Sequence, residues 1–476
     1  SRGHWATNGY FGRFNYSFRN KILLEANGRY DGSSQFPRND QWAFFPSFSA
    51  GYVLTQEPFM DFVKPALSFF KLRGSWGSIG NQAVGGNRFL PVMSSSSSGW
   101  LVGSTNMLTV GTPGLVSPTL TWETVTTLNL GVDARFLNNK LGFSFDWFNR
   151  TTSDMLSAGL TVPSSLGTGA PLRNFGELET KGWEFETDFN HEFSNGLAFN
   201  IRGVLSDFTE RLSVFASNSS KLISSNYEGR NIGEIWGYET DRFFTKDDFV
   251  QDANGNLITV GGKYVMKEGV ATQTRWETGI FFYGPGDIKY KDLNGDGKVD
   301  IGTNTVSDPG DQRVIGNTTP RYQYGINLGV EFKGFDLSAF VQGVGSREMW
   351  ANGPVFVPGF RIGEAWYEHQ LDYWTPENPN AFYPRPTDQA QSNATRNFLP
   401  QTKYLLDMSY TRIKNVNLGY TVPVNLIKRI KLQSARIYVS GENLVTWDNL
   451  TVPIDPEVNY TSSGLNDTST FGRVYP

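Results

Sequence analysis

The residues from Arg321 to Gln342, RYQYGINLGVEFKGFDLSAFVQ, constrain the fold most, because their apolar and polar side chains alternate one by one. The alternation pauses at Lys333-Gly334 and then resumes. Side chains on a β-strand point to opposite faces in turn, so this stretch predicts a hairpin with one apolar and one polar face. The apolar run of its first strand is aromatic at the ends and aliphatic in the middle. This order is typical of a strand that crosses a bilayer with rings at both interfaces.

The same alternation returns along the rest of the chain, and we count about a dozen amphipathic strands. Each is around the 9–11 residues that a tilted membrane strand needs. No run of about 18 apolar residues exists, so the sequence predicts no transmembrane helix. The alternating segments cover residues 10–18, 22–30, 42–54, 67–79, 124–136, 141–147, 183–189, 197–205, 321–342, 404–422 and 435–447.

Short and long connections between these segments also alternate. Soluble β-sandwiches rarely carry structureless loops above about 12–15 residues, whereas a membrane barrel combines tight turns at one end with long loops at the other. A soluble sandwich or propeller would also explain the alternation of side chains. It would not explain why short and long loops alternate along the chain. The short links are residues 19–21, 137–140, 193–196 and 333–334, and the long ones are 80–121, 150–176, 208–320 and 346–403.

Composition narrows the class of protein further. The chain has 476 residues and no cysteine, which excludes a disulfide scaffold and thiolate metal sites. The net charge is -4, so the sequence lacks the excess of basic residues that is typical of nucleic-acid-binding proteins. Charged residues reach 18%, aromatic residues 14%, and glycine counts 51, which together indicate an all-β, turn-rich fold. We therefore predict an all-β transmembrane antiparallel barrel with long extracellular loops.

The ends of the sequence raise an expectation about its completeness. It opens on SRGHW with no charged-then-apolar leader. If the short turns are periplasmic, the strand at 435–447 runs outward, and a further strand must return after Pro476, because unpaired edges in lipid cost several kcal/mol for each backbone group. We expect an N-terminal portion and the last strand of the barrel to lie outside this sequence.

The polar faces of the predicted strands would line the lumen of such a barrel. They carry both signs of charge, and we interpret them as solvated wall rather than as selectivity elements. These residues are Arg13, Glu25, Arg29, Asp133, Arg135, Glu184, Glu186, Asp188, Arg202 and Glu331.

One motif, DLNGDGKVD at residues 292–300, has calcium-loop spacing, with oxygen ligands at positions 1, 3 and 5 and Gly297 at the bend. Position 12 is Thr303, so the usual bidentate carboxylate is missing. Asp308 or Asp311 could replace it if residues 302–310 loop out. The alternative is a solvated turn, which Asp, Asn and Gly also favour. We predict a weakly held, structural Ca²⁺ with ligands Asp292, Asn294, Asp296, Lys298 (by its carbonyl), Asp300 and Asp311.

The remaining motifs point away from catalysis and toward the loops. No acid/base constellation, nucleophile motif or phosphate-binding fingerprint occurs, and the three histidines are far apart, so we predict that the chain is not an enzyme. Tryptophan and tyrosine residues fall in the long loops, where they could stack on a substrate or pack the loops internally. The candidate substrate-binding residues are Trp236, Tyr238, Trp276, Trp350, Trp366 and Trp374.

Several strings, in order along nearly the whole chain, resemble the SusC-like TonB-dependent transporters of the Gram-negative outer membrane. They are YFGRFNYSFRNKILLEANGRYDGSSQF, FFKLRGSWGSIGNQ, NFGELETKGWEFE, DLNGDGKVD, RVIGNTTPRYQYGINLGVEFKGFDLSAFVQG, TRIKNVNLGYTVP and IYVSGENLVTW. In that family the aspartate-rich loop runs straight into an Asp before the Val-Ile-Gly segment. Here residues 301–310 separate the two, which favours Asp311 over Thr303 as the last ligand.

The resemblance implies a barrel of about 22 strands, an N-terminal plug domain and a TonB-contacting segment. It implies import of oligosaccharides or peptides with a SusD-like surface lipoprotein as lid, and it allows a dimer of transporter–lipoprotein pairs. We expect residues 1–476 to be the C-terminal portion of the barrel, without plug and last strand. Residues 208–320, which hold the calcium-like loop, and residues 346–403 would be long extracellular loops, and we expect both to contact the lid. A passive porin and a soluble carbohydrate-binding β protein are the alternatives.

Overall fold

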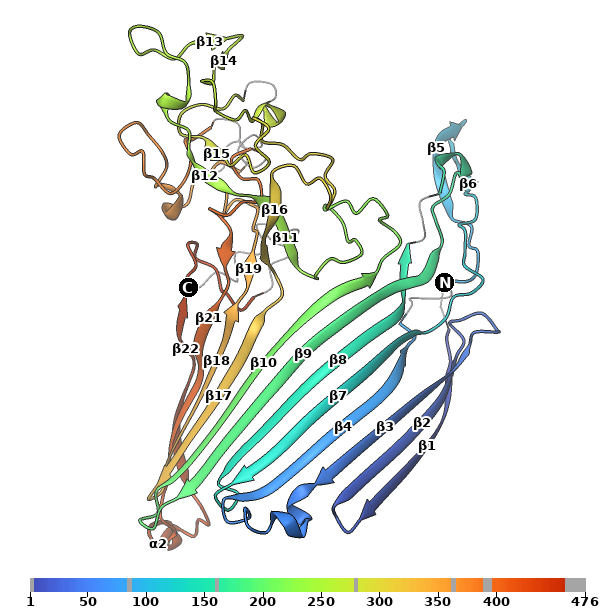
Figure 1. Ribbon diagram of the computed structural model, residues 1–476, viewed down its shortest axis with the longest axis vertical. Coiled ribbons are helices and arrows are strands. Elements are labelled where there is room, and N and C mark those ends of the chain that lie inside the picture. The colour runs from blue at the N-terminus through green and yellow to red at the C-terminus, as the bar shows by residue number, and fades with distance from the viewer. Residues whose placement is uncertain are drawn as a thin grey trace.

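The computed structural model describes residues 4–83, 88–158, 162–277, 281–360, 365–387 and 396–458. Its main feature within these ranges is one sheet of twelve antiparallel strands (Figure 1). Strands that follow one another in the sheet also follow one another along the chain, and the sheet stays open, with β1 and β22 at its edges. This confirms the predicted all-β fold and a partial barrel. The strands are β1 (Thr7–Phe18), β2 (Ile22–Ser33), β3 (Trp42–Val53), β4 (Leu67–Asn81), β7 (Glu123–Phe136), β8 (Leu141–Ala158), β9 (Leu172–Glu192), β10 (Ala198–Val214), β17 (Arg321–Phe332), β18 (Phe335–Ser346), β21 (Tyr410–Thr421) and β22 (Arg436–Asp448).

The tight turns have the backbone conformation that right-twisted hairpins need. Lys333 and Gly334 both have positive φ, 50° and 89°, and Phe332 pairs with Phe335 directly across the turn. Arg19 and Asn20 repeat this at the β1–β2 turn, with φ of 52° each. Two central residues with positive φ match the twist of the flanking strands. The register that follows places the alternating apolar residues of each pair on the same face.

Three strands extend beyond the predicted length. β8 has 18 residues, β9 has 21 and β10 has 17, so residues 150–158, 172–176 and 208–214 are strand rather than loop. The sequence hides the β8 extension because residues 150–154, RTTSD, are polar on both faces, so apolar alternation ends before the strand does. Cross-strand hydrogen bonding alone continues the ladder there, for example between Thr151 and Glu179.

The apolar face of the sheet is exposed along its whole width. Phe48 is 54% exposed, Leu130 50% and Leu328 39%, although they lie in the middle of their strands. Soluble monomers rarely expose contiguous apolar patches above a few hundred Å². The apolar sides therefore do not stack into a dry sandwich core. Further exposed apolar residues on these strands include Tyr10, Phe14, Leu24, Phe44, Leu72, Trp76, Leu128, Phe145, Trp147, Ile326, Leu337, Leu418 and Val439.

The two ends of the sheet differ, as Figure 1 shows: tight turns and short helices lie at one end, and long connections gather at the other. The helical segments at the short end are η1 (Leu54–Gln56), η2 (Pro58–Met60), α2 (Val424–Ile427) and η7 (Lys428–Ile430). Within the part of the chain that the structure describes, no helix has the length and apolar character needed to cross a membrane.

The long connections contain their own small elements. Paired strands are β5 (Ser95–Val102) with β6 (Thr105–Val110), β11 (Glu234–Tyr238) with β16 (Gln312–Asn317), β12 (Thr240–Phe243) with β15 (Ile288–Tyr290), β13 (Thr259–Val260) with β14 (Lys263–Tyr264), and β19 (Glu348–Met349) with β20 (Leu406–Asp407). Single-turn helices are η3 (Ser164–Leu166), η4 (Lys246–Asp248), η5 (Thr274–Trp276) and η6 (Glu368–Gln370).

The described residues of 208–320 and 346–403 pack on each other around a shared core. Its buried side chains come from both connections, including Tyr238 and Tyr290 from the first and Tyr383 and Phe398 from the second. We call this joint unit the loop body. Its position above one end of the sheet places it at the mouth of the partial barrel (Figure 1).

Candidate functional site

The polar face of the sheet is covered by ion pairs that span three strands. Arg73 on β4 reaches across β7 to Asp146 on β8, and it also contacts Asp133, with 3.1 Å between Arg73 Nε and Asp133 Oδ2. Gly131 is the residue between Arg73 and Asp146 in the register. A Cβ added to Gly131 would lie 2.6 Å from Arg73 Cζ, so the guanidinium passes over a position that must lack a side chain.

Two further ion pairs cross the sheet in the same way. Arg135 on β7 and Asp188 on β9 lie on either side of Gly142 on β8, with 3.0 Å between Arg135 Nη1 and Asp188 Oδ2. A Cβ on Gly142 would collide with both partners. Arg436 on β22 and Asp336 on β18 likewise meet over Gly419 of β21, with 3.0 Å between Arg436 Nε and Asp336 Oδ1. These glycines let charges pair across a full strand width.

Most of the charged residues predicted for the polar wall lie in ion pairs, several of them between neighbouring strands. Arg13 donates to Glu25 at 2.6 Å, and Arg202 Nε lies 2.9 Å from Glu186 Oε1. The sequence reasoning missed Arg73 and Asp146, which are central to the network, although both share the phase of the polar positions on their strands. The wall therefore presents alternating, mutually neutralised charges to the interior of the partial barrel.

The loop body holds a buried polar centre in addition to its apolar core. Asp287 is fully buried and accepts hydrogen bonds from Arg385 (2.7 Å), Asn397 (2.9 Å) and the Gly284 amide (2.8 Å). Burial raises the pKa of this carboxyl, and the Arg385 guanidinium offsets part of that rise. Because Asp287 belongs to one connection and its two side-chain donors to the other, the contact fixes the two connections to each other.

A cleft of about 830 Å³ opens where the two connections meet. Both connections contribute to its lining, which has three cationic side chains, one carboxylate and two aromatic rings. Its two prolines belong to residues 346–403. The lining residues are Thr240, Asp241, Arg242, Phe243, Thr245, Lys246, Trp374, Pro376, Pro379, Asn380, Ala381, Thr402 and Lys403. A partly apolar concavity with a few polar groups is the usual form of a small-ligand site.

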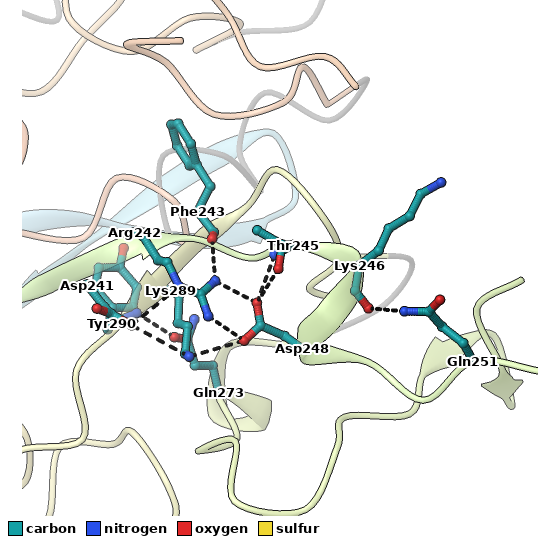
Figure 2. Close-up of polar contacts among 10 residues, drawn as sticks. All are labelled: Asp241, Arg242, Phe243, Thr245, Lys246, Asp248, Gln251, Gln273, Lys289 and Tyr290. Atoms are coloured by element: carbon teal, nitrogen blue, oxygen red, sulfur yellow. Dashed lines mark hydrogen bonds and ion pairs between the residues drawn. The ribbon is translucent and has the colours of Figure 1, made fainter. Parts of the chain in front are cut away.

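A buried carboxylate organises one wall of this cleft (Figure 2). Asp248, 3% exposed, accepts both ends of the Arg242 guanidinium at 2.6 and 2.7 Å, together with Lys289 Nζ at 3.2 Å and the Thr245 amide at 2.8 Å. Burial alone would raise the pKa of Asp248, but the hydrogen bonds from Arg242, Thr245 and Lys289 outweigh it and hold the pKa well below its usual range. Arg242 is thus occupied within the protein.

The six predicted substrate-binding aromatics lie in different surroundings. Tyr238 is 3% exposed and packs edge-on against Trp276 with 5.2 Å between the ring centroids. Trp276 and Trp350 are partly buried against the loop core, Trp236 donates to the Tyr227 hydroxyl at 3.2 Å, and Trp366 packs on Tyr373. Of the six, Trp374 lines the cleft. The substrate-binding role stays a prediction, and the geometry directs it to Trp374.

The predicted calcium ligands mostly bind backbone amides. Asp292 accepts from Gly295 (2.7 Å) and Gly297 (2.9 Å), while Asp311 folds back onto the loop and accepts from Leu293 (2.7 Å) and Asp300 (2.8 Å). Asn294 and Asp296 each accept from the amide two residues on, at 3.0 and 2.9 Å. Within the described residues, no three acidic, His or Cys side chains form a metal-binding group. These backbone hydrogen bonds are compatible with both alternatives, and calcium binding stays a prediction.

Known proteins match this chain over much of its length. A family model described as TonB dependent receptor-like, beta-barrel matches residues 2–342. TonB-dependent receptor P3 from Formosa agariphila is 28% identical over 472 residues, which cover 97% of this chain and 43% of the relative. TonB-dependent receptor SusC from Bacteroides thetaiotaomicron is 30% identical over 283 residues, 54% of this chain and 28% of the relative.

Solved structures agree on the fold. The RagAB peptide transporter matches with a TM-score of 0.70 and 21% sequence identity, over 95% of this chain and 45% of that one. The chain thus spans less than half the length of these relatives. With an open two-faced sheet, sorted connections and a matching family model, the chain belongs to the TonB-dependent receptor family and forms part of its β-barrel.

Proposed function

We propose that this chain is part of an outer-membrane active importer of nutrient oligosaccharides or peptides. The observation that carries the proposal is the two-faced sheet, with exposed apolar side chains on one face and bridged charges on the other. An exposed apolar face requires lipid, and a polar face inside a closed barrel provides a hydrated passage. The loop body and its cleft stand at the mouth of that passage and are suited to meet cargo first.

The proposed energy source is the TonB complex, which would act through a plug domain that closes the passage. A SusD-like surface lipoprotein would close over the loop body and trap cargo against it. Similarity to TonB-dependent receptor SusC supports this arrangement. The proposal also includes a dimer of transporter–lipoprotein pairs. The loop body supports it physically, because its two connections form one packed surface rather than separate mobile loops.

Purification of the tagged full-length protein from its host membrane tests the proposal. We expect a surface lipoprotein to co-purify, and we expect cargo uptake by cells to stop when the TonB complex is disrupted. Replacing residues 346–403 by a short linker should abolish co-purification, because this connection supplies six of the fifteen buried side chains described for the loop-body core. Unchanged co-purification with that variant would show that the lid contacts lie elsewhere.

The alternatives predict different outcomes in the same material. A passive porin would conduct ions steadily in a planar bilayer and support uptake without TonB. A soluble carbohydrate-binding protein would wash off membranes with carbonate, which the exposed apolar face argues against.

A further inference from the structure

Two lysines in the cleft lack the carboxylate partners that the other cations of this region have. Arg242 and Lys289 both contact Asp248, and Lys291 and Arg313 both contact Glu239. Lys246 extends away from the Asp248 cluster in Figure 2, and within the described residues its ammonium contacts no carboxylate. The same holds for Lys403, so within the described residues the cleft has two lysines with no carboxylate in direct contact.

Lys403 is held in a cage of aromatic rings. Its Nζ lies 5.0 Å from the centroid of Phe243, 5.3 Å from that of Phe382 and 5.6 Å from that of Tyr404. The faces of these rings attract a cation but do not neutralise it. Burial lowers the pKa of Lys403, with Asp372 opposing the change. A half-buried ammonium with no carboxylate in direct contact is costly, and an incoming anion would offset that cost.

The neighbouring carboxylates have other hydrogen-bond or ion-pair partners. Asp372 already accepts from the Asn378 side chain and the Phe382 amide, both at 3.0 Å. Asp241, which also lines the cleft, lies 3.5 Å from Lys289. The two lysines are therefore available to a ligand.

Trp374 contributes an aromatic ring to the cleft lining. A Cβ added to Gly286 would collide with the Trp374 ring, so the Gly286 backbone covers one face of this indole. Pro376 and Pro379 extend the apolar wall, and the exposed Asn380 adds a side-chain amide beside it. A ring with one covered face and hydrogen-bonding groups around it suits a sugar ring, which has an apolar face and a polar edge.

We propose that this cleft binds an acidic oligosaccharide, with a uronic-acid carboxylate between Lys246 and Lys403 and a sugar ring against Trp374. The inference rests on the proposed import function and specifies its cargo. Arg242 stays paired with Asp248 and shapes the wall, whereas the two lysines act as point charges that do not demand one carboxylate orientation. Neutral sugars would gain the aromatic contact but not the charge contact.

Calorimetry on the full-length transporter purified with its lipoprotein tests this inference. The probes are trisaccharides of galacturonate, glucuronate and mannuronate, the methyl ester of each, and a tripeptide with two glutamates. We expect at least one acid to bind about tenfold more tightly than its ester. We also expect this preference to shrink between about 20 mM and about 500 mM salt, because ions screen exposed charges.

Charge-removing variants identify the cleft as the site. Lys246→Met and Lys403→Met keep most of the side-chain stem, and each should weaken binding of the acid about tenfold while leaving the ester unaffected. Lys246 is exposed, so its replacement does not threaten folding. The matched control is Lys267→Met, an exposed lysine in the same connection that does not line the cleft, and it should bind as the unaltered protein does.

Three results would overturn the inference. They are equal binding of every acid and its ester, equal loss in Lys267→Met, and tighter binding of the acidic tripeptide than of every uronate, which would assign the cleft to peptides. In each case the lipoprotein should still co-purify and TonB-dependent uptake should persist. Loss of those two properties would instead count against the proposed function.

Discussion

At the scale of single residues, glycine is what allows charges to pair across the wall. Adjacent strands lie about 4.8 Å apart, so an Arg and an Asp on strands two apart must bridge roughly 10 Å. Arg73 and Asp146 do so directly above Gly131, where no Cβ obstructs the guanidinium. Glycine is therefore needed in this chain not only at turns but also inside strands, where it makes room for these ion pairs.

Replacing Gly131 by Ala should destabilise the barrel by about 1–3 kcal/mol, because the new methyl group displaces Arg73 from Asp146. Gly12→Ala is the matched control, since Gly12 also lies within a strand of the sheet but a Cβ there meets nothing within 4 Å. Heat-dependent gel migration of the detergent-solubilised protein measures the stability of both variants. A loss as large in Gly12→Ala would show that backbone effects, rather than the bridge, set the cost.

The Asp248 cluster makes a pH-dependent prediction. Asp248→Asn should destabilise the loop body at pH 7 by on the order of 2 kcal/mol. This is less than the 3–5 kcal/mol for a fully buried pair, since the Arg242 side chain is 43% exposed and water screens the interaction. The folded pKa of Asp248 is depressed, so its stabilisation is complete above the unfolded value of about 3.9 and is lost as pH falls through the folded pKa.

The gap between the unaltered protein and Asp248→Asn should therefore be constant near neutral pH and begin to close below about pH 4. Hydrogen exchange of residues 240–290 measures it. Asp247→Asn is the control, because Asp247 is exposed and adjacent. A gap that widens on acidification would contradict the assignment of Asp248 as the charged partner.

At the scale of elements, the two long connections behave as one folding unit. Tyr404 stacks on Phe398, with 4.7 Å between the ring centroids, and both belong to the core that includes Tyr238 and Tyr290. Asp287 and its donors Arg385 and Asn397 tie the same halves together. The shared core therefore couples the structure of one connection to that of the other.

Tyr404→Ala should therefore loosen both connections, at a cost of about 3–5 kcal/mol, the usual range for truncating a buried aromatic residue. We expect faster hydrogen exchange in residues 234–290 as well as in residues 380–406. Phe62→Ala, at the opposite end of the sheet and 82% exposed, should change neither. Loss of protection confined to residues 380–406 would mean that the connections fold independently.

At the scale of the whole molecule, the sheet has to separate lipid from a hydrated interior. Phe48 and Ser49 are neighbours on β3, so their side chains lie on opposite faces. Phe48 stacks on Trp76 on the apolar face, with 6.2 Å between ring centroids, whereas Ser49 lies opposite Glu25 in the register. One residue step thus moves a side chain from the predicted lipid to the predicted lumen.

Phe48→Arg should cost about 2–4 kcal/mol and reduce the amount of assembled barrel in the outer membrane, because it places a cation in the apolar face. Ser49→Arg should cost about 0–1 kcal/mol, since its charge faces Glu25. Quantifying folded protein in isolated outer membranes compares the two. Equal assembly of both variants would contradict the assignment of lipid to the apolar face.

The sequence by itself determined the strands, their faces and the open barrel, because alternation with a period of two is a local property of the chain. The turn at Lys333-Gly334 and the sorting of short and long connections are local in the same sense. The ends of β8, β9 and β10 were missed. At the end of β8 the residues are polar on both faces, so apolar alternation stops although pairing with β9 continues.

The tertiary structure alone decided which distant residues meet. The bridge from Arg73 to Asp146 over Gly131, the joint core of the two connections and the cleft between Lys246, Trp374 and Lys403 each unite residues far apart in the chain. No local pattern encodes such contacts, because they depend on register across several strands and on how two long connections pack. The aromatic residues of the loops were visible in the sequence, but their burial, which separates Tyr238 in the core from Trp374 in the cleft, was not.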